Sequence, residues 1–316
     1  TYEGLNGAAN PNTATSYTVE SETITLQDFS HDDYTFEGWF DAETGGNKVT
    51  SIPKGSTGNK TLYAHCTWKW IGTKNPTTAK AVGDIVFSDG SATAYTSGLT
   101  LTSEQKSKAV AVIFYAGSAS DTLGAKTLGV GLQNATGDGN TLEWAPYNTT
   151  GYTTNFTDIQ CTKSTTAPTE GTAYYTFTFS NTTYYVTGDF DGSDNWAKVC
   201  ATDSTASENA AENYPAFNWV NNYGNSLSGD YASGWYLPSC VELRILYDNK
   251  DTVNAALEAA GGTEMEISDT GYWSSSHNPS GNNYPAWWVR FNDNDGYITY
   301  GIDEHDKKSV CAVRAF

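Results

Sequence analysis

The end of the chain contains three aromatic segments that decide its fold: GYWSSS at residues 271–276, AWWVRF at 286–291 and VCAVRAF at 310–316. Side chains alternate between the two faces of an extended strand, so Trp287 and Val289 fall on the same face. An apolar face of this kind predicts a strand packed against a core. The segment GWYLPS at 234–239 is expected to contribute to the same core. The residues expected to be buried in these four segments are Trp235, Leu237, Trp273, Trp287, Val289, Phe291, Val313 and Phe316.

Helical signals precede these segments. Residues 239–242 read SCVE, a capping box in which the Ser oxygen accepts a backbone N–H and the Glu carboxylate reaches back to the cap. An Ala-rich stretch at 252–260 stops at two glycines, which is typical of a helix end. The other predicted elements are helices at 101–105 and 214–223, strands at 82–87 and 109–115, and long ordered loops with short strands between 117 and 172. The order predicts an α+β domain with helices between β segments.

The first 70 residues form a separate unit. Short strands are predicted at 23–26, 34–40 and 62–68, with Gly- and Asn-rich turns between them. Tyr34, Phe36 and Trp39 are expected to face inward. Small polar residues and Pro76 mark the junction that follows, so the predicted domains are 1–70 and 71–316.

Charge and composition exclude several classes of partner. The 316 residues include 17 Lys and Arg against 36 Asp and Glu, a net charge of -19. Nucleic acid and anionic membrane surfaces are therefore not expected as partners. No stretch approaches the roughly 20 apolar residues of a transmembrane helix. The chain opens on Thr1 rather than Met, so a leader is expected either to have been removed or to lie outside this sequence. Membrane attachment is expected only through a lipid anchor outside this sequence.

Signals for metal and nucleophilic chemistry are weak. The five cysteines are far apart and are predicted to be small buried hydrophobes, with one disulfide left open. No histidine pair has metal-ligand spacing, and no Gly-x-Ser-x-Gly elbow is present. One candidate cation site remains, with calcium as its expected ion: Asp189, Asp191 and Asp194 surround a Gly turn. The alternative is a polar turn in which the Asp side chains cap their own backbone.

The N-terminal unit resembles the internalin-type (Listeria–Bacteroides) repeat. The matching segments are YTFEGWF at 34–40, VTSIPKGSTG at 49–58 and LYA at 62–64. The start of the chain, TYEGLNG at 1–7, fits the first strand of such a repeat. The resemblance implies a β-grasp-like spacer module on a bacterial surface protein, with no chemistry of its own.

The C-terminal domain resembles the C-type lectin fold of the formylglycine-generating-enzyme subtype. The matching segments are GWYLPS at 234–239, followed by Glu242-Leu243, and the three aromatic segments quoted first. More narrowly, it is similar to variable proteins of diversity-generating retroelements, the treponemal type included. The resemblance implies a non-enzymatic, ligand-binding display protein on the bacterial surface, expected as a lipoprotein. Its C-terminal region, about 271–316, would be diversified by adenine mutation of Asn codons.

The candidate binding residues combine tyrosines and other rigid groups with short polar side chains, the composition of a paratope. They are His277, Asn278, Asn283, Tyr284, Trp288, Arg290, Asn292, Asp295, Tyr297, Thr299, Tyr300, Asp303 and His305. The expected partner is a variant-specific ligand, either a protein or a surface glycan. The resemblance implies that some residues of this region are fixed scaffold: Trp273, Trp287, Lys307 and Lys308. Two others do not fit mutated Asn codons: Trp288 and Glu304. The alternative is that these are ordinary surface loops of a Tyr-rich β protein.

Two other functions use the same fold. One is an enzyme or enzyme remnant of the formylglycine-generating type, which would need a cysteine pair near the C-terminus, where Cys311 stands alone. The other is a fixed, undiversified adhesin. Calcium-mediated sugar binding is not expected, because Glu-Pro-Asn and Gln-Pro-Asp are absent and Phe291-Asn292-Asp293 only echoes the third lectin motif.

Overall fold

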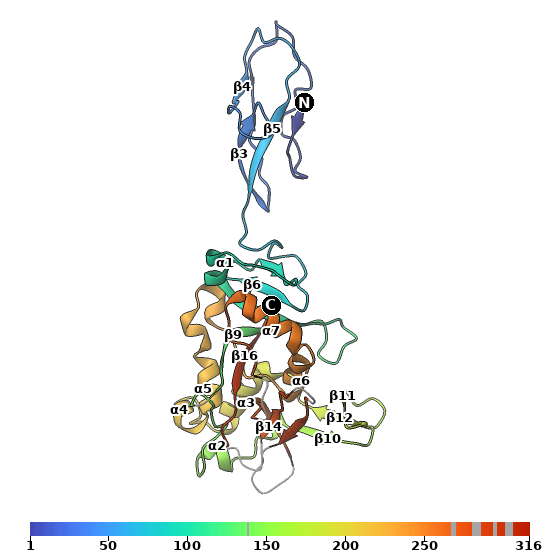
Figure 1. Ribbon diagram of the computed structural model, residues 1–316, viewed down its shortest axis with the longest axis vertical. Helices are drawn as coiled ribbons and strands as arrows, with labels where there is room; N and C mark the ends of the chain where they lie inside the picture. The colour runs from blue at the N-terminus through green and yellow to red at the C-terminus, as the bar shows by residue number, and fades with distance from the viewer. Residues whose placement is uncertain (138, 267–269, 280–285, 293–295, 301–305) are drawn as a thin grey trace. The chain divides into compact units, whose positions relative to one another are not determined.

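A computed structural model describes residues 1–137, 139–266, 270–279, 286–292, 296–300 and 306–316. The chain divides into two compact units, Thr1–Trp70 and Ile71–Phe316 (Figure 1). The N-terminal unit has one hydrophobic core, and the C-terminal unit has two: a first core that contains α6 (Cys240–Asp248) and α7 (Lys250–Ala260) and a second core that contains α5 (Pro215–Asn221). Within the described ranges, no helix combines the length and apolar character needed to cross a bilayer.

The N-terminal unit is built from two small sheets. Its strands are β1 (Tyr2–Glu3), β2 (Ile24–Thr25), β3 (Tyr34–Phe40), β4 (Ser51–Ile52) and β5 (Leu62–Trp68). In the larger sheet β5 lies between β1, which is parallel to it, and β3, which is antiparallel. β2 and β4 form an antiparallel pair. The three strands predicted at 23–26, 34–40 and 62–68 are confirmed.

A bulge in β3 decides which aromatic side chains enter this core. The register with β5 shifts between Phe36 and Gly38, so β3 has one extra residue there. Gly38 adopts a φ of 144°, which L side chains rarely take. The extra residue puts Phe36 and Trp39 on the same face although they are three apart, and both pack into the core. Tyr34 instead packs on Trp68, with ring centroids 5.2 Å apart.

A five-stranded antiparallel sheet organises the C-terminal unit, in the order β16-β9-β8-β6-β7. Its strands are β6 (Asp84–Phe87), β7 (Ala92–Ala94), β8 (Ala109–Ala116), β9 (Thr127–Ala135) and β16 (Val310–Ala315). The last strand of the chain pairs with β9 and so closes one side of the sheet (Figure 1). The strands predicted at 82–87 and 109–115 are confirmed.

Strand β9 is an error of the sequence prediction, which placed only loops and short strands between 117 and 172. It runs for nine residues in the middle of the sheet. Gly129 and Gly131 interrupt its apolar alternation. A Cβ on Gly129 would lie 2.7 Å from the Phe316 ring, and one on Gly131 would lie 2.3 Å from the Tyr223 hydroxyl. Glycine is required because aromatic rings from distant segments lie directly on the strand.

Two three-stranded antiparallel sheets complete the β structure. They contain β10 (Cys161–Ser164), β11 (Tyr175–Phe179) and β12 (Thr182–Gly188), and β13 (Tyr272–His277), β14 (Ala286–Val289) and β15 (Ile298–Tyr300). The mixture of helices with mostly small antiparallel sheets is consistent with the predicted α+β class.

Short helices cover both faces of the large sheet. The α-helices are α1 (Ser103–Lys108), α2 (Thr150–Thr153), α3 (Asn195–Thr202), α4 (Ala210–Asn213), α5 (Pro215–Asn221), α6 (Cys240–Asp248) and α7 (Lys250–Ala260). The 3-10 helices are η1 (Thr157–Ile159), η2 (Gly192–Asp194), η3 (Tyr223–Ser226) and η4 (Gly229–Ala232). α6 and α7 pack in the core on one face, and α5 packs in the core on the other. The capping box of α6 is confirmed, and α7 ends at Gly261 with φ 77° as the glycine signal predicts.

The residues predicted for the core are buried, with one exception. Trp235, Leu237, Trp273, Trp287, Val289, Phe291 and Val313 are all buried, whereas Phe316 is only half-buried. Phe316 ends the chain and packs against Tyr231 at the edge of the second core. All five cysteines are free, and three of them (Cys161, Cys240 and Cys311) are fully buried.

Candidate ligand-binding site

The predicted binding residues lie on and around β14 and β15. Trp288 pairs with Thr299, and Trp287 pairs with Tyr300. Directly opposite residues of antiparallel strands point to the same face. Trp288 and Thr299 therefore share one face of the small sheet, while Tyr300 shares the other face with Trp287. The candidates Trp288 and Tyr300 thus lie on opposite faces of the small sheet, because the register places Tyr300 on the side of Trp287.

Neither face of this sheet is a free surface. Trp287, Val289 and Ile298 belong to the core that contains α6 and α7. Trp273 belongs to the core that contains α5, and Trp288 packs against it. The sheet is thus held between two cores.

Tyr300 is the most exposed candidate among the described residues, with 46% of its surface accessible. Its ring lies edge-on to the Trp287 ring, with centroids 5.1 Å apart. Trp287 is 2% exposed, and its Nε1 donates to the carbonyl oxygens of Cys161 and His277, each at 2.9 Å. The accessible Tyr300 ring thus packs on the ring of Trp287, which is buried and held by hydrogen bonds.

A lysine lies next to three aromatic rings on the side of the sheet that contains Trp287. Lys163 Nζ lies 3.8 Å from the Tyr297 ring centroid, 5.3 Å from that of Tyr184 and 5.6 Å from that of Trp287. It also donates to the carbonyl oxygen of Ile298 at 2.6 Å. Burial lowers the pKa of Lys163 to about 8. The sequence analysis missed Lys163 and Tyr184. The alternating Tyr, Thr and Phe residues of β11 and β12 are a signal that could have pointed to Tyr184, whereas Lys163 lies in β10, outside that pattern.

The face of the sheet that contains Trp288 has a second cation–aromatic group. Lys308 Nζ lies 4.0 Å from the Trp288 ring centroid and 5.2 Å from that of Trp273. The Arg290 guanidinium lies 5.9 Å from the Trp288 ring. Lys308 is buried, which lowers its pKa. Trp288 is therefore held in a packed arrangement and is only half-exposed.

His277 and Asn278 are not in an exposed loop, so this part of the prediction is wrong. His277 ends β13 and is fully buried, and Asn278 is buried beside it. The imidazole lies against Trp144 and Phe156, with ring centroids 4.5 Å and 5.2 Å away. Burial lowers the pKa of His277 to about 3, so the ring is neutral. Two aromatic residues from more than 100 positions upstream cover this segment.

The remaining candidates divide into two sets. Arg290, Asn292, Tyr297 and Thr299 are half-buried. Asn283, Tyr284, Asp295, Asp303 and His305 lie outside the described residues. The role of both sets in binding stays a prediction.

The candidate calcium site is filled by lysines. Lys198 Nζ lies 2.8 Å from the carboxylate oxygens of both Asp189 and Asp194, and Lys126 Nζ lies 2.6 Å from Asp191. Among the described residues, no group of three or more His, Cys, Asp or Glu could hold a metal ion. Each of the three carboxylates thus has a lysine ammonium group as its ion-pair partner, and calcium binding at this turn stays a prediction. Asp191 also caps η2 by accepting from Ser193 N, as the polar-turn alternative predicts.

A buried carboxylate lies next to this turn. Glu242 is fully buried; its Oε2 accepts from Ser239 N at 2.9 Å and from Gly192 N at 3.1 Å. Its Oε1 accepts from the Tyr236 hydroxyl at 3.0 Å. Burial raises the pKa of Glu242 to about 7 despite these bonds. The group joins α6 to η2 and has a structural rather than a ligand-binding position.

Comparison with known protein families assigns the N-terminal unit. Residues 1–65 match the Listeria–Bacteroides repeat domain. The resemblance that the sequence showed for this unit is confirmed. The match ends within β5 and so concerns the N-terminal unit alone.

Comparison with solved structures gives a likeness in fold. A fimbrial protein from Bacteroides ovatus aligns with a TM-score of 0.50 and 17% sequence identity, over 75% of this chain and 49% of that protein. The chain thus spans about half the length of the fimbrial protein. No curated protein sequence matches the chain. The C-type lectin fold and the retroelement family stay predictions, because neither match concerns them.

Proposed function

We propose that this chain is an extracellular, surface-associated binding protein of a bacterium. The N-terminal Listeria–Bacteroides repeat and the likeness in fold to a fimbrial protein support a surface location. In the proposal the C-terminal unit has a C-type lectin fold of the formylglycine-generating-enzyme subtype. It binds a protein or a surface glycan through side chains of residues 271–316, which a retroelement diversifies.

The observation that carries the proposal is the contrast between neighbouring positions of one small sheet. Trp287 and Val289 are buried and fix β14 in the core. Tyr300, directly opposite Trp287, has 46% of its surface accessible. A side chain at such a position can change without altering the packing beneath it. This property is what a diversified binding region needs.

The enzymatic alternative has less support. A formylglycine-generating reaction would need a reactive thiol in this region. Cys311 lies in β16, is fully buried, and its pKa is raised by that burial, so the reactive thiolate is disfavoured. A fixed adhesin would have the same structure. An adenine-mutated near-copy of the 3′ coding end beside a reverse transcriptase gene would separate the diversified protein from the fixed one.

A pair of matched variants tests the binding region. Tyr300→Ala removes the accessible ring in the proposed site, and Tyr147→Ala removes one that is 62% exposed elsewhere. Both variants should melt within a few degrees of the unmodified protein, since surface substitutions change stability by about 0.5 kcal/mol or less. A ligand found on protein and glycan arrays should bind the Tyr300 variant more weakly and the Tyr147 variant unchanged. Equal binding by both variants would place the site elsewhere.

A further inference from the structure

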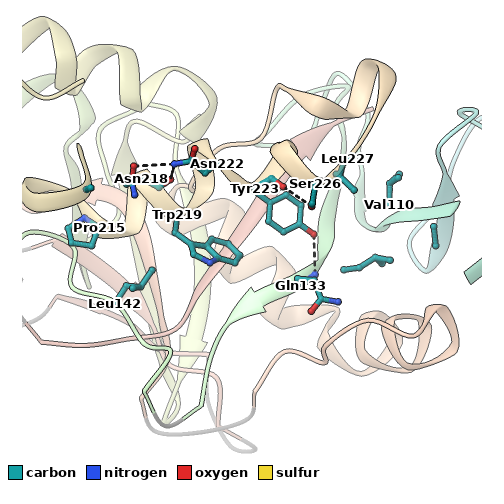
Figure 2. Close-up of a pocket in the computed structure, with 13 residues that line it drawn as sticks. Val110, Gln133, Leu142, Pro215, Asn218, Trp219, Asn222, Tyr223, Ser226 and Leu227 are labelled. Carbon is teal, nitrogen blue, oxygen red and sulfur yellow. Dashed lines mark hydrogen bonds between the residues drawn. The ribbon is translucent and has the colours of Figure 1, made fainter. Parts of the chain in front are cut away.

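A cavity of about 680 Å³ opens between α5, η3 and the ends of β8 and β9 (Figure 2). Its size is within the range of small-molecule sites, roughly 300–1,000 Å³. None of its described lining residues belongs to 271–316, so it is separate from the proposed variable region. It therefore belongs to the constant part of the fold.

The described lining of this cavity has no charged side chain. A cationic or anionic ligand would lose its hydration there without gaining a counter-charge. The net charge of -19 opposes anions further. A ligand for this cavity must therefore be neutral.

Trp219 supplies the principal binding surface. Its indole is half-buried and extends into the cavity between Leu142 and Tyr223, as Figure 2 shows. The Tyr223 ring lies 5.5 Å from it at an interplanar angle of 53°. Tyr223 is in turn fixed, because its hydroxyl accepts from Gln133 N at 3.1 Å. The indole of Trp219 therefore presents a flat apolar ring face, and its position is constrained by the Tyr223 ring.

The cavity lining also contains three side-chain amides, those of Gln133, Asn218 and Asn222. Asn222 Nδ2 donates to the backbone oxygen and to Oδ1 of Asn218, at 2.8 and 3.1 Å (Figure 2). Gln133 Oε1 accepts from the Thr263 hydroxyl at 3.0 Å. Within the described chain, the NH₂ groups of Asn218 and Gln133 have no partner. Two amide groups of the lining, those of Asn218 and Gln133, thus have their oxygen atoms bonded within the protein.

We propose that this cavity binds a neutral saccharide unit. A pyranose ring has an apolar C–H face that fits against an indole and a rim of hydroxyl groups that both donate and accept. Amides match those hydroxyls because they contain both donors and acceptors. A purely apolar ligand would leave the NH₂ group of the half-buried Asn218 without a partner when it excluded water. The arrangement therefore favours a sugar over an apolar peptide side chain.

The test uses the full chain and an array of neutral oligosaccharides built from glucose, galactose, mannose and N-acetylglucosamine. Sialylated and sulfated glycans are the charged controls, and apolar peptides are the alternative occupant. The strongest neutral binder is then titrated calorimetrically. We expect Trp219→Ala and Asn218→Ala each to weaken binding roughly tenfold. Trp219→Phe, which keeps a ring, should lose less.

Tyr300→Ala separates this site from the variable region, since it should leave saccharide binding unchanged. If Trp219→Ala does not fold, Asn218→Ala and Gln133→Ala decide the question, because both replace polar side chains at the cavity rim. The proposal is overturned if no neutral glycan binds at millimolar concentration, or if charged glycans or apolar peptides bind instead. Loss of binding in the Tyr300 variant alone would also overturn it, while supporting the variable region as the glycan site.

Discussion

Glu242 allows a quantitative test of the packing around α6. Its carboxyl is fully buried, and burial raises its pKa from 4.5 to about 7. At 1.36 kcal/mol for each pKa unit, this difference corresponds to roughly 3 kcal/mol. Because the folded pKa is the higher one, the folded protein binds more protons than the unfolded chain between pH 4.5 and 7. The stability from protonated Glu242 is complete below pH 4.5 and is lost as the pH rises through about 7.

Glu242→Gln removes this titration while keeping the shape of the side chain. The amide oxygen can accept from Ser239 N and Gly192 N, and the NH₂ group can donate to the Tyr236 oxygen. The free energy of unfolding of both proteins is measured by urea denaturation at several pH values from 4.5 to 8. As the pH rises, the unmodified protein should lose stability relative to the Glu242→Gln variant. The expected relative fall is roughly 3 kcal/mol.

Glu258→Gln is the matched control, because Glu258 lies exposed on the neighbouring α7. Its stability should follow that of the unmodified protein at every pH. A difference between unmodified protein and Glu242→Gln that stays constant from pH 4.5 to pH 8 would refute the raised pKa. If the unmodified protein instead gained stability relative to Glu242→Gln as the pH rose, the pKa of Glu242 would be lowered in the folded protein rather than raised.

Two further predictions concern the framework. Trp287→Ala should destabilise the protein by about 3–5 kcal/mol, because it deletes a ring that is 2% exposed together with its two hydrogen bonds; an unchanged melting temperature would contradict the strand phase. Residues 71–316 should unfold cooperatively without the N-terminal unit, since the two units have separate cores; a truncated chain without a thermal transition by circular dichroism would contradict this independence.

Local signals predicted much of the fold correctly. The capping box at Ser239 and Glu242 and the glycine stop at Gly261 act within a few residues, so the sequence contains them whole. Strand β9 was not predictable in this way. Gly129 and Gly131 are needed in this strand because the Phe316 and Tyr223 rings lie against it, and both rings come from distant parts of the chain. A pattern rule reads such glycines as loop residues.

The candidate binding site shows the same limit. His277 is a polar residue in a polar segment, and only the fold reveals that Trp144 and Phe156 enclose it. The alternation of β14 correctly separated Trp287 from Trp288. It could not show that the second face is also covered, because the covering side chain, Lys308, is distant in sequence and nominally a surface residue.

The packing of Trp288 bears on how such a region could vary. Trp288 could not arise from a mutated Asn codon, which set it apart from the other candidates. The structure supplies a physical reason for a constant residue there: its ring lies against the second core and below the Lys308 ammonium, 4.0 Å away. Trp273 and Lys308, its neighbours, belong to the expected fixed scaffold. Trp288 therefore fits the scaffold better than the contact set. Variation would be tolerated at accessible positions such as Tyr300, which belongs to neither core.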